Sequence, residues 1–270
     1  MSAPHANAAR FINQVRTGPR GGAPVVLVHP VGLDLSYWDR QIEALCDAHD
    51  VVAFDLPGHG SSPGSPGSPA DWTLDQAADV LAQVVRGTGS AGAHLVGLSV
   101  GGMISQALTL AQPGLVRSLT LIDTAAAFSE EGRAGMRARA GMARSGGMAA
   151  VLPSTLQRWF MPETVARRPD LIDRVSKTLL ADDPLVHAAM WDMISALDLV
   201  SQLHRISCPT LILVGEHDPS SPPAAARVLQ ENIQEAEMYV IPGASHMAPL
   251  EKPGMINGYL QAFLDRQIET

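Results

Sequence analysis

A serine between two glycines is the group in this sequence best suited to covalent chemistry. Gly97-Leu98-Ser99-Val100-Gly101 has the G-x-S-x-G pattern and lies between a strand-like apolar run (93–96) and a helix-like one (101–111). A sharp strand-to-helix turn would expose the serine hydroxyl, which becomes a nucleophile when a base takes its proton. The motif predicts Ser99 as the nucleophile of an acyl transfer, with the Val100 N–H directed at the oxyanion. An ordinary glycine-rich turn is the alternative interpretation.

A base and an acid to serve Ser99 are expected after other strands, because functional groups gather at the carboxyl ends of parallel strands. His246 follows the last strand-like run, and Asp218 follows the run before it. We predict His246 as the general base and Asp218 as the carboxylate that orients it. Asp123, which also ends a strand-like run, is the alternative acid, and Glu216 is a further carboxylate within reach.

The oxyanion needs a second hydrogen-bond donor, and the loop after the first buried strand is the place to seek it. His29-Pro30-Val31-Gly32 occupies that position. Pro30 has no N–H to give, so the Val31 N–H is the predicted donor beside Val100. Losing one such donor typically costs about 2.7 to 4 kcal/mol of transition-state stabilisation.

The elements that must position these residues follow from the apolar pattern. Runs such as 25–28 and 211–214 are apolar throughout, which is typical of strands covered on both faces. Strand-like and helical segments alternate, so the sequence predicts an α/β fold with a mostly parallel central sheet and helices on both faces. The strand-like runs lie at 24–29, 51–55, 93–98, 115–123, 210–215 and 238–241, with an N-terminal edge strand expected at 11–15.

The alternation stops between about 128 and 200, where the sequence is rich in Ala, Met and Arg and contains no strand-like run. We therefore predict a helical cap, residues 128–200, inserted into a core domain made of residues 1–127 and 201–270. The serine- and proline-rich stretch 61–69 predicts an exposed loop.

Composition and charge exclude several classes of protein. A hydrophobic content of 46% and a charged content of 17% are typical of a folded globular chain. The net charge of -8, without a basic stripe, argues against nucleic acid as a partner. With two cysteines and no apolar stretch of about 20 residues, we expect a cytoplasmic protein without a disulfide framework or a membrane partner. No motif implies a metal site or a cofactor, and a homo-oligomer stays open.

The whole chain resembles the α/β-hydrolase superfamily. Residues 55–62 (DLPGHGSS) are similar to its D-x-x-G-x-G-x-S turn, and residues 243–253 are similar to its histidine loop. The chain order Ser99, Asp218, His246 is also that of the superfamily. Within it the sequence resembles the 3-oxoadipate enol-lactonases, although Pro30 stands where many relatives carry a small residue. That likeness rests on 32–38 (GLDLSYW), 97–102 (GLSVGG), Arg144, Gly147-Met148 and Arg158-Trp159-Phe160.

The resemblance implies hydrolysis of a carboxylic ester or lactone, a small-molecule substrate, through an acyl-enzyme and without a cofactor. Three alternatives remain: carbon–carbon bond hydrolysis of vinylogous diketones, cofactor-free perhydrolysis, and a small-ligand receptor of the same fold. The residues expected to contact substrate are Trp38, Trp159, Trp191 and Arg144. Arg144 is the first choice to pair with a substrate carboxylate; the other arginines considered in the cap are Arg133, Arg137, Arg139 and Arg158.

Overall fold

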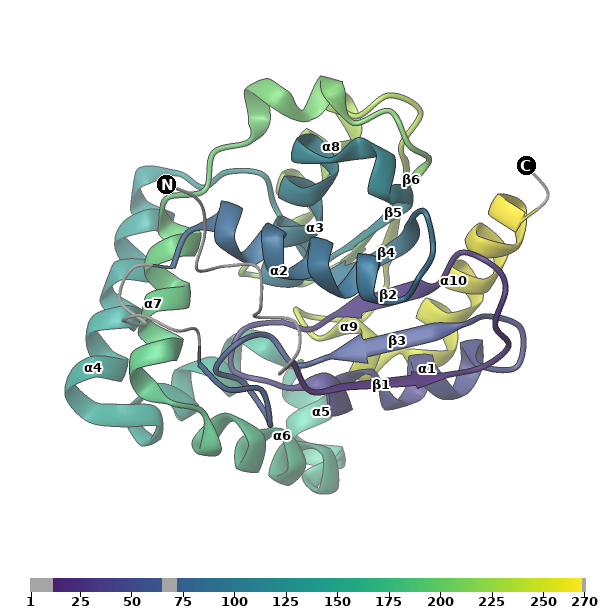
Figure 1. The fold of residues 1–270 in the computed structure, drawn as a ribbon. Helices are drawn as coiled ribbons and strands as arrows, with labels where there is room; N and C mark the ends of the chain where they lie inside the picture. Colours follow the sequence, from purple (N-terminus) through teal and green to yellow (C-terminus); the bar gives the residue numbers. More distant parts are fainter. Residues whose placement is uncertain (1–11, 65–71, 269–270) are drawn as a thin grey trace.

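A computed structural model describes residues 12–64 and 72–268, which contain a seven-stranded sheet (Figure 1). Its strand order is β1-β3-β2-β4-β5-β6-β7, with β1 antiparallel to β3 and the other pairs parallel. The predicted α/β fold is therefore confirmed. The strands are β1 (Gln14–Thr17), β2 (Val25–Val28), β3 (Val51–Phe54), β4 (Ala93–Leu98), β5 (Val116–Ile122), β6 (Thr210–Gly215) and β7 (Glu237–Ile241).

The central strands of the sheet are made mostly of residues whose side chains are buried. Every residue of β2, β3, β4 and β6 is buried, as expected for apolar strands covered on both faces. The edge strand differs from the prediction of 11–15: β1 runs from Gln14 to Thr17 and its first three residues are exposed. An edge strand needs no apolar run, which is why the pattern misplaced it. Part of the predicted strand, Phe11, lies outside the described residues.

Helices cover both faces of the sheet. In Figure 1, α2, α3 and α8 lie on one face, and α1 and α10 lie on the other. Thr73 and Gln76 form a reciprocal capping box that begins α2. Within residues 12–64 and 72–268, no helix is both long and apolar enough to cross a bilayer. The bounds are α1 (Asp39–Leu45), α2 (Leu74–Gly87), α3 (Val100–Ala111), α8 (Pro223–Asn232), α9 (Ala248–Glu251) and α10 (Pro253–Ile268).

Four α-helices and then a 3-10 helix (Val200–Arg205) lie between β5 and β6 in the described chain, and we call residues 130–195, which hold the four α-helices, the helical segment. The four α-helices are α4 (Glu130–Trp159), α5 (Pro162–Arg167), α6 (Pro169–Ala181) and α7 (Pro184–Ser195). α4 and α7 pack side by side at the left of Figure 1. α4 is two helices joined at Gly147, whose φ of 65° interrupts the helical backbone.

The two chain segments that connect the helical segment to the sheet lie side by side. Ala127 and Asp198 form an isolated antiparallel bridge, and the Leu199 N–H donates to the Ala126 carbonyl oxygen at 2.8 Å. The division into a core and a cap at residues 128 and 200 stays a prediction. Of the predicted loop 61–69, residues 65–69 lie outside the described part of the chain.

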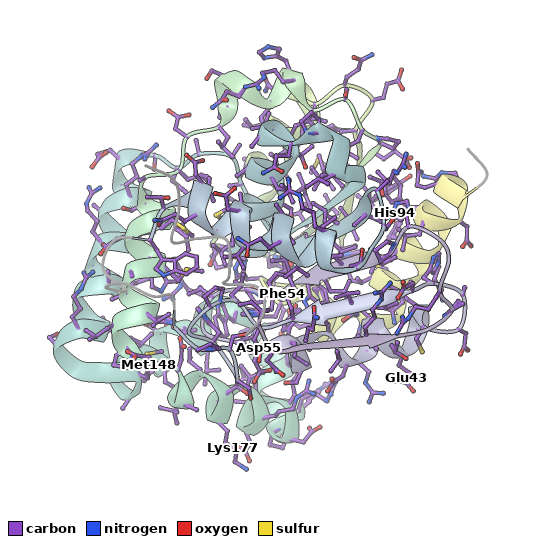
Figure 2. All side chains as sticks on the ribbon, viewed as in Figure 1. Glu43, Phe54, Asp55, His94, Met148 and Lys177 are labelled. Atoms are coloured by element: carbon purple, nitrogen blue, oxygen red, sulfur yellow. The ribbon has the colours of Figure 1, made fainter. Side chains whose placement is uncertain are left out.

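Asp55 joins two loops at the carboxyl end of the sheet. Figure 2 labels it beside Phe54, the last residue of β3. Its Oδ1 accepts from the Leu35 N–H at 2.7 Å, and its Oδ2 accepts from the Ser61 N–H at 2.8 Å. The carboxylate thus fixes the turn after β3 against the loop after β2, which carries the predicted oxyanion donor Val31.

The buried imidazole of His94 predicts a pH-dependent stability. Burial, with smaller contributions from His49 and Arg117, lowers the pKa of His94 to about 4. Between about pH 6.5 and pH 4 the unfolded chain therefore binds a proton that the folded chain refuses, so stability falls as the pH falls. We expect the free energy of unfolding to be lower at pH 5 than at pH 7, by up to about 2 kcal/mol for this group.

Urea unfolding at the two pH values measures this difference. Figure 2 shows His94 at the opposite end of the molecule from Met148 of α4, so His94→Gln can be made far from the helical segment. In this variant the difference in the free energy of unfolding between pH 7 and pH 5 should be smaller than in the wild type. It should not vanish, because buried His29 has a pKa lowered to about 3 and also destabilises the fold as the pH falls. An unchanged pH dependence in His94→Gln would contradict the assignment.

Candidate active site

Ser99 stands at a strained turn between β4 and α3. Its φ of 54° and ψ of -119° are unusual for a residue with a side chain, and it is 7% exposed. Glycines make the turn possible: a Cβ at Gly97 would collide with the backbone of Gly101, and one at Gly101 would collide with the Val28 carbonyl group at the end of β2. The spacing of the motif is thus explained by backbone contacts on both sides of the serine.

His246 reaches Ser99 from the loop after β7. Its Nε2 lies 3.1 Å from the Ser99 Oγ. The loop is fixed on both sides of the histidine: the Ser245 N–H donates to Glu251 at 2.6 Å, and the Met247 N–H donates to the Trp159 carbonyl oxygen at 3.0 Å. The imidazole is therefore held in place by backbone hydrogen bonds of its neighbours.

Asp218 completes the chain of contacts from the loop after β6. Its Oδ2 lies 2.8 Å from the His246 Nδ1, and its Oδ1 accepts from the backbone N–H groups of Ser220 and Ser221 at 2.7 and 3.1 Å. When Nδ1 donates to this carboxylate, Nε2 is free to accept the Ser99 hydroxyl proton. The structure brings these three predicted residues together.

The alternative acid, Asp123, has a different set of partners. Its Oδ1 accepts from the Gly215 N–H at 2.7 Å, and its Oδ2 accepts from the Ala248 N–H at 3.2 Å. Burial, followed by the nearby Asp218, raises the pKa of Asp123 well above its usual range. Both oxygens are thus bonded to backbone groups of the loops that carry Asp218 and His246. The other alternative, Glu216, is half exposed and accepts from the Gly243 N–H at 3.0 Å.

The predicted oxyanion donors lie at the carboxyl end of the sheet, Val100 at the start of α3 and Val31 in the loop after β2. Val100 is the first residue of α3, so its N–H has no acceptor within the helix. Val31 is buried in the loop after β2, next to Gly32, whose φ is 76°. His29 supports this loop: its Nε2 accepts from the Leu56 N–H at 2.8 Å, and burial and then the neighbouring His59 lower its pKa to about 3. We therefore describe His29 as a neutral structural imidazole.

The sequence of the chain matches a known protein family. The family model described as the alpha/beta hydrolase family matches residues 25–257. The chain belongs to this family.

Solved structures and curated relatives of this hydrolase agree with that family and with the enol-lactonase resemblance. 3-Oxoadipate enol-lactonase 2 of Acinetobacter baylyi is 28% identical over 94% of this chain and 93% of its own length. The enol-lactonase of Burkholderia xenovorans is 30% identical, covers 94% of this chain and 96% of its own, and has a TM-score of 0.87. A thermophilic esterase from Thermogutta terrifontis is 32% identical, with coverages of 95% and 93% and a TM-score of 0.86.

The three tryptophans predicted to contact substrate are all buried, and each has different neighbours. Trp38 is fully buried edge-to-face against Tyr37. Trp159 is buried at the end of α4, where its carbonyl group holds the histidine loop. Trp191, on α7, donates its indole N–H to the His187 Nε2 at 2.9 Å.

Arg144, the arginine predicted to pair with a substrate carboxylate, already has an acidic partner in the helical segment. Its guanidinium forms an ion pair with Asp192, and both side chains are partly exposed. Arg139, five residues earlier on α4, instead stacks over the Trp191 ring, with its guanidinium carbon 5.0 Å from the ring centroid. The charge on Arg144 is therefore already balanced within the helical segment.

Glu251 is a supporting residue whose role the sequence did not reveal. Its Oε1 accepts from the Met161 N–H at 2.8 Å and from the Thr164 hydroxyl at 2.6 Å, while its Oε2 holds the Ser245 N–H. One carboxylate thus joins α5 to the histidine loop. The signal available in the sequence was its position five residues after His246, within a stretch already assigned to the histidine loop.

Proposed function

We propose that this protein is a serine hydrolase that cleaves a carboxylic ester or lactone through an acyl-enzyme, with an acidic enol-lactone as the preferred type of substrate. The observation that supports the proposal is a chain of hydrogen bonds. Ser99 stands at the strained turn between β4 and α3, its Oγ contacts His246, and His246 contacts Asp218. Such a chain of nucleophile, base and orienting acid is suited to acyl transfer.

The proposed reaction uses groups of the chain and water. The Ser99 Oγ attacks the carbonyl carbon while the His246 Nε2, at 3.1 Å, takes the hydroxyl proton. Asp218 stabilises the imidazolium, and the Val31 and Val100 N–H groups stabilise the oxyanion. His246 then gives the proton to the leaving oxygen, and water releases the acyl group by the same steps. With a lactone, the alcohol and the acid leave as one molecule.

An acidic substrate is supported by two arginines of α4, Arg139 and Arg158. Neither Arg139 nor Arg158 has a carboxylate partner among the residues that the structure describes. The Arg158 Nη1 and Nη2 donate to the Ser154 carbonyl oxygen and the Thr155 hydroxyl at 2.8 and 3.3 Å, and the Arg158 Nε is buried there without a hydrogen-bond partner. Burial lowers the pKa of both groups, that of Arg158 to about 10 with a contribution from Arg139. A guanidinium group is nevertheless protonated in proteins at neutral pH. A partly buried cation without a counter-charge is stabilised by a bound carboxylate.

The position of the Arg158 backbone relative to His246 follows from a hydrogen bond. The Ser245 hydroxyl donates to the Arg158 carbonyl oxygen at 3.1 Å, so the end of α4 lies directly against the histidine loop. We extend the proposal to the helical segment: it acts as the cap that sets substrate specificity, and Arg139 takes the carboxylate-binding role first given to Arg144. The reason is that Arg144 already has Asp192 as its partner.

Arg139→Met is expected to raise KM for an acidic enol-lactone by a factor on the order of 10 to 100, because one or two charge-assisted hydrogen bonds are lost. KM for the neutral methyl ester of the same acid should change by less than about threefold, since that ester offers no carboxylate. Steady-state kinetics of both substrates measure this. Arg144→Met is the matched control and should leave both KM values close to those of the wild type.

Two outcomes would remove the acidic lactone from the proposal. One is an equal response of both substrates to Arg139→Met. The other is a wild-type preference for the neutral ester, which is expected when an unpaired carboxylate must be desolvated to enter the site. Either result would leave a general carboxylic-ester hydrolase. Activity toward vinylogous diketones in place of both substrates would favour the carbon–carbon bond hydrolase.

A further inference from the structure

A buried chain of polar side chains runs through the helical segment, and the proposed reaction does not use it directly. His187 and Trp191 lie four residues apart on α7, and the Trp191 indole N–H donates to the His187 Nε2 at 2.9 Å. The opposite ring nitrogen, Nδ1, lies 2.9 Å from the Asp182 Oδ2. Because Nε2 is the acceptor, the neutral imidazole carries its proton on Nδ1 and donates it to Asp182.

Asp182 depends on His187 for its hydrogen bonding. The Asp182 side chain is 3% exposed, and its Oδ1 has no hydrogen-bond partner among the residues that the structure describes. The His59 Nε2, which also lacks a hydrogen-bond partner within the described residues, lies 3.9 Å from the Asp182 Oδ2. A buried carboxylate with so few partners is costly, so the His187 contact is strongly favoured over a broken one.

The middle of this chain, His187, packs against the core loop that carries Val31. A Cβ added to Gly32 would lie 2.9 Å from the His187 Cε1 and 2.6 Å from the Leu179 Cδ1, so the imidazole sits directly against the backbone of Gly32. The backbone of Gly58, beside His59, is contacted in the same way by Val186 of α7. The imidazole is thus wedged between the helical segment and the core, which leaves its ring little freedom to turn.

The chain ends at a positively charged group, the guanidinium of Arg139. The guanidinium carbon of Arg139 lies 5.0 Å from the centroid of the Trp191 ring, within the range of a cation–π interaction. Since His187 holds the indole N–H, the plane of the ring is fixed, and so is the face on which the guanidinium rests. The contacts therefore run without interruption from Asp182 through His187 and Trp191 to Arg139.

We propose that Asp182 and His187 are positioning residues that set the angle of the Trp191 ring and thereby place the Arg139 guanidinium for a substrate carboxylate. This inference rests on the proposed function, in which Arg139 binds the acidic end of the substrate. Without the imidazole, a buried indole N–H loses its acceptor, the ring is free to turn, and the long arginine side chain loses its platform. Recognition of the acid then weakens, although Ser99, His246 and Asp218 keep their contacts with one another.

A pair of His187 variants tests the proposal. His187→Met fills similar space but offers neither hydrogen bond, whereas the amide of His187→Gln has one donor for Asp182 and one acceptor for the Trp191 N–H. We expect His187→Met to raise KM for the acidic enol-lactone about tenfold and KM for the neutral methyl ester less than about threefold. His187→Gln should bring KM for the acidic enol-lactone most of the way back to the wild-type value. The exposed His204, replaced by Met, is the control and should leave both KM values unchanged.

A second measurement does not depend on activity. The Trp191 indole N–H resonance, assigned by its absence from the Trp191→Phe spectrum, should exchange with solvent far more slowly than the indole N–H of a short peptide, in the wild type and in His187→Gln. Fast exchange in the wild type would overturn the proposed hydrogen bond. If His187→Met does not fold, this resonance and the KM values of His187→Gln and Trp191→Phe decide the proposal, and Trp191→Phe should also raise KM for the acid.

The outcomes separate this inference from the proposed function. Equal KM changes for the acid and the ester in His187→Met, or no rescue by His187→Gln, would overturn the positioning role while the hydrolase proposal stands. A wild type that hydrolyses neither substrate would contradict the proposed function and with it the link to a substrate carboxylate. A slowly exchanging Trp191 N–H in that case would show that the Asp182, His187 and Trp191 contacts exist without serving this recognition.

Discussion

Ser99→Ala is expected to lower kcat by about 10⁴-fold or more, because a nucleophile, its base and its orienting acid act as one unit. The fold should stay intact, since alanine removes only the hydroxyl group from a turn that glycines make possible. Steady-state hydrolysis of an activated ester measures the loss. Pre-steady-state mixing should also show a burst of alcohol release in the wild type and none in the variant.

A buried serine of the following helix provides the control for this experiment. Ser105 is fully buried on α3, where its hydroxyl donates to the Gly101 carbonyl oxygen at 2.7 Å. Ser105→Ala should keep kcat within about threefold of the wild type, because alanine suits a helix interior and no proton transfer depends on this hydroxyl. Near-native activity of Ser99→Ala would contradict the whole mechanism. A wild type that binds small ligands without forming an acyl-enzyme would instead favour the receptor alternative.

The sheet was largely predictable from the sequence because its strands are buried on both faces. β2 and β6 are continuous apolar runs, and such runs have few other places in a folded chain. The exposed edge strand β1 lacks this signal, and it was displaced in the prediction. The non-helical backbone at Gly147 was also not predicted, because a glycine in a helical sequence does not by itself reveal a φ of 65°.

The catalytic candidates were predictable for a different reason: each lies just after a strand. Strand ends can be read from the apolar pattern, and parallel strands bring their carboxyl ends to one edge of the sheet. Ser99, Asp218 and His246 were therefore expected to lie close together, and the structure places their side chains in contact. Both Asp218 and Asp123 follow strands, so Asp218 was preferred on the chain order Ser99, Asp218, His246. The structure adds the 2.8 Å contact between Asp218 and His246.

The arginine of the helical segment was not predictable in this way. Arg139 and Arg144 are five residues apart, which separates their directions on a helix by about 140°. Which of them faces Trp191 and which faces Asp192 depends on how α4 packs against α7. The sequence of α4 is rich in small residues and arginine, so it has no apolar stripe strong enough to show this. The four-residue spacing of His187 and Trp191 was the one local signal of the buried chain on α7.

Asp218→Asn is expected to lower kcat by about 10⁴-fold while changing the free energy of unfolding little. An amide cannot stabilise the imidazolium, and its N–H₂ group favours the tautomer in which His246 Nδ1 accepts and Nε2 is protonated. Nε2 then cannot take the proton of Ser99. The backbone N–H groups of Ser220 and Ser221 still find an acceptor in the remaining amide oxygen, so the loop keeps its shape. Steady-state kinetics and urea unfolding of the variant measure the two effects.

Asp123→Asn should show the opposite pattern, which makes it the matched comparison. Both Asp123 oxygens accept backbone N–H groups, from Gly215 and Ala248, and an amide has only one oxygen to offer. One buried N–H would then face an NH₂ group, so we expect a loss of about 1 to 3 kcal/mol in the free energy of unfolding. The fall in kcat should be at most about tenfold, because the contact between Asp218 and His246 is not removed. If Asp123→Asn were instead the more damaging to kcat, with its stability unchanged, the orienting acid would be Asp123, and the 2.8 Å contact of Asp218 with His246 would have to be a structural one.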